Sequence, residues 1–349
     1  MPENLNTNRI ESEDLHSGQV TDTLGQNSKK SRSKAKPILI VTSLVLFLGI
    51  VAAVFFAYSF NKSYSKHVGM LKDKSQSQSK QLDSLSTSFS IVVNTMKDSN
   101  EDDLQSSISL IQNTEKENSG EVLALEDSPE MKKLRKLSEE YRSIIETLGK
   151  IEATNKDIEN LLVEKPYVKY LNYKNPQLDT QVIKDTNEFT KNAGIIMSYF
   201  KDQTVLSIEE STVIYDLVAD VVSAFYSDFD EFYVSSIEAK LDKLDSTQNK
   251  LENLNTDNLP DSIKEGHRAH VEELDAGVKD LRVLVQAMRD KDYYFLLSFA
   301  QSLDTATSSV VASEEVALSE AITFWQENET IRSVPGLVKS WENFGTSIK

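Results

Sequence analysis

Residues 37–60 read PILIVTSLVLFLGIVAAVFFAYSF and contain no charged side chain. A helix of this length extends about 36 Å at 1.5 Å per residue, which is enough to cross a hydrocarbon core of roughly 30 Å with some tilt. Tyr58, near the far end, suits the headgroup level. The stretch therefore predicts a transmembrane helix. It decides the architecture, because every other part of the chain lies on one side of it or the other.

A cleaved signal peptide is the alternative for the same stretch. Such a peptide has an apolar core of about 7–15 residues followed by small residues at the cleavage site. Here the apolar core is longer, 36 residues precede it, and Ala57-Tyr58-Ser59 is a poor cleavage site. We favour an uncleaved signal anchor, so that the lipid bilayer is the first partner, through residues 37–60.

Flanking charges favour one orientation of this anchor. The basic residues within eight positions of the stretch are Lys29, Lys30, Arg32, Lys34 and Lys36 before it, and Lys62 and Lys66 after it. The denser cluster belongs on the cytoplasmic side. Residues 1–36 are rich in polar side chains and predict a disordered cytoplasmic tail. We therefore expect a single-pass protein of the cell membrane, with its C-terminal domain outside the cytoplasm.

Composition bounds the rest of the chain. The sequence has 349 residues, a net charge of −17, 11 Gly, 7 Pro and no Cys. Because turns consume Gly and Pro, their scarcity favours few, long elements and an all-α fold. The lack of Cys excludes disulfides, zinc–thiolate sites and iron–sulfur clusters. The acidic charge argues against a nucleic-acid partner, since phosphates repel it.

Apolar residues after the anchor recur at helical spacing and divide the chain into segments. Residues 61–97 predict a helical stalk that continues the membrane helix, with Gly69 and the Ser/Gln-rich residues 75–79 as places for a break. Residues 98–128 are polar and predict a flexible acidic linker with a short helix. Residues 129–349 predict an extended helical bundle domain.

Ser128-Pro129 has the cap and first-turn residues of a helix start. The apolar stripe of the helix that follows contains one polar residue, Asn155. A buried Asn in such a stripe can fix the register of packed helices. The alternative is that Asn155 lies at the margin of the stripe.

Two later stripes predict an antiparallel coiled-coil hairpin. Ser207 to Glu210 fits a capping box, which predicts a helix start and one apolar stripe from Ile214 through Phe225 and Phe232 to Leu251. A turn with Pro260 follows, and then a second stripe from Leu274 to Met288. Two stripes joined by a short turn are typical of a helical hairpin, which would bring Leu244 and Leu281 to neighbouring helices.

Catalytic motifs are absent from the sequence, with no P-loop, dinucleotide fingerprint, nucleophile elbow or His-Glu-x-x-His motif. His267 and His270 share a helix face and are the candidate metal ligands. The Glu-x-x-His pattern of a bundle metal site is missing around them, however, which favours solvated histidines near a turn. We expect no catalytic residues, cofactor or native metal.

Aromatic residues are dense between positions 199 and 299, and at helical spacing they predict core. Tyr226 and Tyr233 lie off the main stripe and are the candidates for exposed partner contacts.

These features favour a non-enzymatic protein of the cell envelope that presents an acidic helical bundle as a scaffold or protein-interaction module. Its partner would be another protein or a second copy of the chain. The alternatives are an extracytoplasmic ligand-binding sensor bundle and an activator of envelope enzymes. A buried polar cavity would favour the sensor.

The orientation predicts a protease result. Protease added to sealed right-side-out cells should digest residues 61–349 and spare the N-terminal tail, as read by immunoblotting with a tag at each end. Survival of residues 61–349 under these conditions, with digestion after lysis, would reverse the topology.

Overall fold

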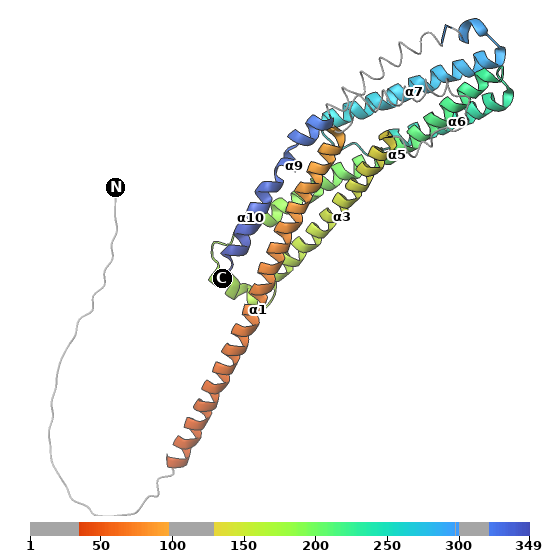
Figure 1. Ribbon diagram of the computed structural model, residues 1–349. Helices are drawn as coiled ribbons and strands as arrows, with labels where there is room; N and C mark the ends of the chain where they lie inside the picture. The colour runs from red at the N-terminus through yellow and green to blue at the C-terminus, as the bar shows by residue number, and fades with distance from the viewer. Residues whose placement is uncertain (1–34, 98–128, 297, 300–320) are drawn as a thin grey trace, which may run out of the picture. The chain divides into compact units, whose positions relative to one another are not determined.

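A computed structural model describes residues 35–97, 129–296, 298–299 and 321–349. Helix makes up 89% of the structure, and these ranges contain no strand. The all-α prediction and the prediction of a helical bundle are therefore confirmed (Figure 1). Most of the predicted tail and the whole predicted linker, 98–128, lie outside the described residues.

The chain divides into two compact units, Met1–Asn61 and Lys62–Lys349. Helix α1 (Ala35–Lys97) is continuous from the first unit into the second. Neither Gly69 nor the Ser/Gln-rich residues 75–79 break it. One Gly costs a helix about 1 kcal/mol, which is too little to break a helix that is packed against neighbours on both sides of the position.

In the first unit, residues 45–59 of α1 expose their apolar side chains, and Phe55 and Phe56 are 67% and 71% exposed. By length and composition this helix can cross a membrane, and it is the one helix of that kind among the described residues. No part of its most apolar window is buried inside the protein.

In the second unit, α1 from Lys62 onward belongs to the bundle, which corrects the predicted stalk. Leu82, Leu85, Phe89 and Val92 are buried. The predicted apolar stripe is buried, but its partners are helices that follow much later in the sequence. Gln78 Nε2 donates to a main-chain carbonyl of α3 (Pro129–Val163) at 3.1 Å, which shows that these two helices pack together.

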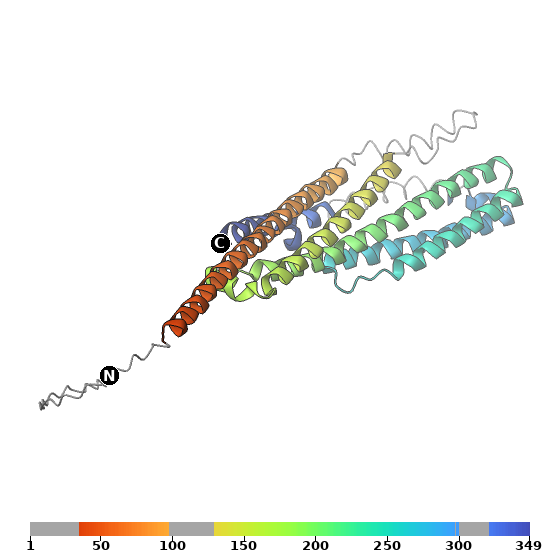
Figure 2. The same cartoon turned by 90° about the horizontal axis from the view of Figure 1, so that it is seen from below.

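Four helices form one half of the bundle: α1 from Lys62, α3, the first half of α5 (Gln181–Tyr226) and α10 (Val334–Ser347) (Figures 1 and 2). Short helices α4 (Tyr167–Lys174) and α9 (Glu329–Arg332) lie in the connections. Several aromatic rings pack together in the core of this half. Trp325 is 5.8 Å from Tyr141 and 5.2 Å from Phe200, measured between ring centroids.

A set of buried polar side chains joins these helices. Asn155 is fully buried and donates to a main-chain carbonyl of α5 at 2.9 Å, so it is a residue of the stripe and not of its margin. Trp341 Nε1 donates to Thr186 Oγ1 at 2.8 Å, and Ser75 Oγ donates to the Trp341 carbonyl at 2.8 Å. Buried polar groups of this kind favour one register, because any shift leaves them without partners.

Helix α5 corrects the predicted helix start at Ser207. The helix runs from Gln181 to Tyr226 without interruption. Residues 201–206 contain neither Gly nor Pro, so the main-chain N–H groups near Ser207 have carbonyl partners one turn earlier. A capping box matters only where those partners are missing.

The predicted stripe from Ile214 to Leu251 is two helices, which is a second correction. Helix α5 ends at Tyr226, and α6 (Glu231–Glu252) begins after a sharp reversal. Asp228 and Phe229 have φ angles of 53° and 61°. Asp230 caps α6, because its side chain accepts from the Phe232 N–H at 2.8 Å.

The other half of the bundle contains the second half of α5 with α6 and α7 (Asp261–Asp290). Helices α6 and α7 pack against each other and are joined by the short connection 253–260. Leu244 is buried in their shared core, and Leu281 packs against it. The regular coiled-coil geometry of this pair stays a prediction.

The burial of Trp341 predicts a large stability effect. Trp341→Ala should lower the free energy of unfolding by about 3–5 kcal/mol, because it opens a cavity and leaves the buried Thr186 hydroxyl without its donor. Urea denaturation of the full chain in detergent, followed by far-UV circular dichroism, measures this. The control is Tyr294→Ala, at a residue 86% exposed, which should change stability by no more than about 0.5 kcal/mol. Equal losses in both variants would contradict the packing of α10.

Candidate functional site

Residues 225–233 and 289–294 form one end of the bundle (Figure 1). This end carries a group of exposed aromatic side chains, and we call it the aromatic tip. Its exposed members, between 42% and 86% accessible, are Phe225, Tyr226, Phe232, Tyr293 and Tyr294. Among the described residues from 62 onward, Tyr173 is the one further aromatic side chain that is exposed to a similar degree. A cluster of exposed apolar side chains indicates an interaction surface, whereas single exposed apolar residues are common on any protein.

Backbone conformation sets the tip apart as well. Among the described residues, the non-glycine residues with a positive φ angle are Asp228, Phe229 and Lys291. The left-handed region costs an L-residue roughly 1–2 kcal/mol. Strain of this kind persists where the side chains are needed, and it is concentrated at functional sites.

Each of these three side chains has a structural use. Lys291 Nζ donates to one carboxylate oxygen of Asp228 at 2.9 Å, and the Tyr293 hydroxyl donates to the other at 2.8 Å. Phe229 is buried beneath them, with its ring centroid 5.2 Å from that of Phe225 and 5.8 Å from that of Tyr293. Asp228 therefore connects the turn before α6 to the segment after α7 and holds the aromatic rings in place.

The pKa values of this group follow from its geometry. Hydrogen bonds from Lys291 and then Tyr293 lower the pKa of Asp228, and the Asp228 partner raises the pKa of Lys291. The contact between them is present above the ordinary aspartate pKa and is lost as pH falls through the lowered value. Asp228, Lys291 and Tyr293 are all exposed, so water screens the ion pair between Asp228 and Lys291. The pair therefore orders the tip locally and contributes little to the stability of the whole protein.

The charges around the rings are mainly acidic. The acidic residues are Asp228, Asp230, Glu231, Asp290 and Asp292, and the basic residues are Arg289 and Lys291. Arg289 is already paired with Glu231 and Glu238 at 3.2 and 2.5 Å. An aromatic, acidic surface repels phosphates and suits a partner that carries apolar and cationic groups, which can lie on the ring faces.

The two predicted contact residues differ in the structure. Tyr226 is exposed at the tip, whereas Tyr233 packs against the core of α5, α6 and α7. Phe225 and Phe232 were predicted as core and are exposed, because the helix break places them beside a reversal and not along one stripe. The signal for this break was the turn-forming sequence Ser-Asp-Phe-Asp at 227–230.

The candidate metal ligands have other partners. His267 is buried and not solvated as predicted, with its ring 5.7 Å from that of Tyr199 in an edge-to-face arrangement. Burial, and then the nearby His270, lower the pKa of His267. His270 Nε2 lies 3.1 Å from a carboxylate oxygen of Glu210. Across the described residues, no group of three or more His, Asp or Glu side chains is arranged to hold a metal ion.

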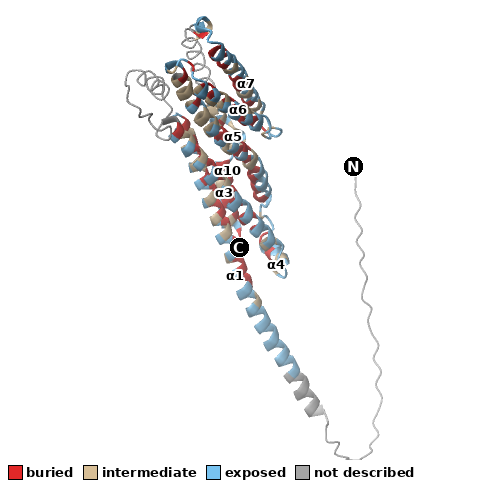
Figure 3. Cartoon of the chain, turned by 90° about the vertical axis from the view of Figure 1, so that its right-hand side faces the viewer, coloured by how far each residue is buried: buried red, intermediate tan, exposed pale blue. Residues whose placement is uncertain are grey.

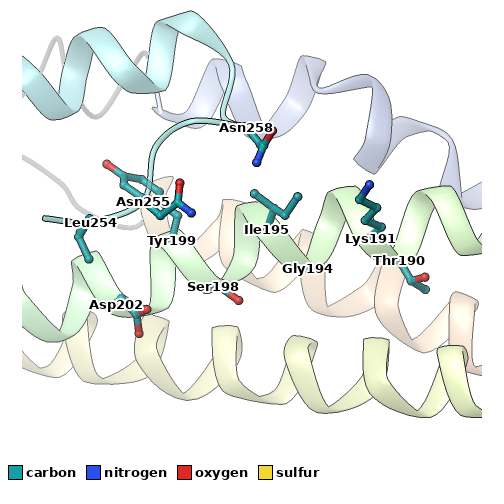
Figure 4. Close-up of a pocket in the computed structure, with 10 residues that line it drawn as sticks. All are labelled: Thr190, Lys191, Gly194, Ile195, Ser198, Tyr199, Asp202, Leu254, Asn255 and Asn258. Atoms are coloured by element: carbon teal, nitrogen blue, oxygen red, sulfur yellow. The ribbon is translucent and has the colours of Figure 1, made fainter.

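A groove where α5 passes the α6–α7 connection is the second candidate site. It has a volume of about 430 Å³ and is open to solvent. Asn255 and Asn258 of the connection face α5, which contributes Ser198 and Asp202 (Figure 4). Ile195, Tyr199 and Leu254 also line the groove, so a small molecule there would meet both polar and apolar groups while staying open to solvent.

Comparison with known proteins adds no assignment. A scan against protein family models, a search of curated proteins and a search of solved structures each found no match. The function is therefore proposed from the residues and geometry described above.

Removing the Asp228 carboxylate should loosen the tip. In both Asp228→Gly and Asp228→Ala, amide hydrogen exchange of residues 225–233 and 290–295 should be faster, because Lys291 and Tyr293 lose their shared acceptor. Asp228→Gly relieves the backbone strain, so Asp228→Ala should be the less stable of the two by roughly 1 kcal/mol. Unchanged exchange in both variants would show that Asp228 does not order the tip.

Proposed function

We propose that this protein is a non-enzymatic, single-pass protein of the cell envelope that displays its helical bundle outside the membrane as a protein-interaction module. Residues 37–60 cross the bilayer with the N-terminus in the cytoplasm. The observation that carries the proposal is the aromatic tip, where five exposed aromatic side chains lie beside three residues with left-handed backbone conformation.

The membrane assignment is supported by the first unit of the chain. An apolar helix with exposed Phe55 and Phe56 is unfavourable in water and favourable in lipid. The basic residues before the apolar stretch favour their side as the cytoplasmic one.

The interaction role is supported by the chemistry of the tip. Tyr is enriched among the residues that dominate binding energies, since it combines a large apolar ring with a polar group. A surface that is ordered before binding loses little conformational entropy on association. Asp228, with Lys291 and Tyr293, supplies that order through its hydrogen bonds.

The surrounding carboxylates narrow the choice of partner. A protein segment with Lys or Arg beside apolar residues complements the tip, whereas an acidic surface is repelled. A second copy would therefore have to bind through a less acidic face than the tip. In this proposal, the helical hairpin of α6 and α7, predicted as a coiled coil, supports the tip, because α6 begins and α7 ends there.

A sensor for small molecules is the second candidate function, and the groove beside Asn255 and Asn258 is the observation that favours it. Its volume of about 430 Å³ lies within the range of small-molecule sites. It ranks second because such sites bury most of their ligand, and this groove is open.

Site-specific photocrosslinking tests the interaction role. A photoreactive amino acid at Tyr226 or Tyr294 in the full chain in membranes should yield discrete protein adducts, and self-association would give an adduct of twice the mass of the chain. The control position is Glu152, exposed on α3. Adducts at Glu152 as abundant as those at the tip would contradict the proposal.

With a captured partner in hand, Tyr294→Ala should weaken its binding by roughly tenfold or more, as expected for a residue that dominates a binding interface. The control is Val283→Ala, which removes another exposed apolar side chain, from α7.

A further inference from the structure

The end of the bundle that begins at Lys62 has a composition unlike the rest of the chain. Helix α4 lies there, in the connection 164–180 between α3 and α5, and its sequence is YVKYLNYK (Figure 3). Its rings pack on α1: Tyr170 lies 4.7 Å from Tyr64, and Tyr167 lies 4.6 Å from His67, between ring centroids. We call residues 62–69 together with 164–180 the basic end.

The basic end is positively charged in a chain whose net charge is −17. It has five exposed lysines, Lys62, Lys66, Lys165, Lys169 and Lys174. Its two carboxylates already have partners. Glu164 lies 3.2 Å from His67 Nδ1, and Asp179 accepts from the Gln181 N–H at 2.9 Å.

The lysines of the basic end, in contrast, lack carboxylate partners among the described residues. Within the described part of the chain, none of the five forms an ion pair with a carboxylate. Lys174 instead lies over the ring of Tyr170, with Nζ 5.4 Å from the ring centroid. Exposed, unpaired lysines held in one region complement an anionic surface.

Apolar groups are exposed among these lysines. Tyr173 on α4 is 77% exposed, and Val163 at the end of α3 is 67% exposed. Tyrosine rings with lysines beside them are typical of segments at the headgroup level, where the ring meets the apolar boundary and the ammonium group meets phosphate.

Chain connectivity limits how far the basic end can be from the apolar stretch. Lys62 follows Phe60, the last residue of that stretch, by two positions. The four residues from Phe60 to Tyr64 can span no more than roughly 14 Å, even when fully extended. The headgroup layer on each side of a bilayer is roughly 5–7 Å thick. Because α4 contacts Tyr64 and His67, it is within reach of that layer.

We infer that the basic end binds the anionic phospholipid headgroups of the membrane in which α1 is anchored. The inference rests on the proposed crossing of that membrane by residues 37–60. Lysines 165, 169 and 174 contact the phosphates, and Tyr173 inserts its ring at the apolar boundary. The consequence is a second attachment beside the anchor, which limits rotation and tilting of the bundle at the membrane.

Because the chain has no Cys, a single label reports on this contact. In the full-length Asn172→Cys chain, an environment-sensitive fluorophore on exposed α4 should emit at shorter wavelength in vesicles of phosphatidylcholine with phosphatidylglycerol than in phosphatidylcholine alone. High salt should reverse the shift, because it screens the lysine–phosphate attraction. The same emission in both vesicles would overturn the inference.

Matched variants identify the groups responsible. The Lys165→Gln, Lys169→Gln, Lys174→Gln triple variant should lose the lipid-dependent shift, and the corresponding Lys→Arg triple variant should keep it. A control triple variant, Lys136→Gln, Lys150→Gln, Lys243→Gln, makes the same change in net charge at exposed lysines of α3 and α6. A loss of the shift in this control equal to that in the first variant would show that overall charge, and not the basic end, is responsible.

A second label separates this inference from the membrane anchor. A fluorophore at Phe55→Cys should report hydrocarbon in both vesicle types. If it reports water, the anchor and the proposed function are wrong together with the inference. If it reports hydrocarbon while the label at residue 172 does not respond to anionic lipid, the anchor stands and the lipid contact alone is refuted.

Discussion

Trp341 makes the contacts on which the second unit depends. Its carbonyl accepts from Ser75 of α1, and its indole donates to Thr186 of α5, at 2.8 Å in each case. One residue near the end of the sequence thus joins two helices, α1 and α5, that come much earlier in the chain. Gly345, one turn later, allows a close approach, because a Cβ there would lie 2.8 Å from Ser75 Oγ. Without α10, the apolar stripe of α1 would lose one of the helices that pack against it.

The two ends of the second unit have opposite chemistry, and each has a physical basis. The aromatic tip is acidic, and its rings are ordered by a left-handed turn and the Asp228 contacts. The basic end has an exposed Tyr173 and lysines that form no ion pair with a carboxylate in the part of the chain that the structure describes. An acidic domain beside an anionic bilayer would otherwise be repelled from it. In the proposed membrane attachment, the lysines of the basic end would offset that repulsion while the rest of the bundle stays acidic.

The sequence predicted one exposed residue of the aromatic tip, Tyr226, and the failure to predict its neighbours has a clear cause. Tyr226 stood out because it lies off the apolar stripe. Phe225 and Phe232 did not, because they fit a stripe that continues through the reversal at 227–230. Periodicity cannot register a break that preserves the spacing of apolar residues on both sides. The capping residue Asp230 marked the break, but a single Asp is a weak signal in a chain with 55 acidic residues.

The sequence by itself determined the local features. These are the uncharged stretch 37–60, the scarcity of Gly and Pro, and the helices that the apolar stripes predict. These depend on neighbouring residues along the chain, so they can be read without knowing the fold. Tertiary structure alone decided which stripes meet. Residues 62–97 looked like a stalk because their partners, α3 and α10, lie far away in the sequence. Helix pairing depends on which apolar faces come together on folding. Because the stripes contain similar residues at similar spacing, no single stripe indicates which other stripe it will contact.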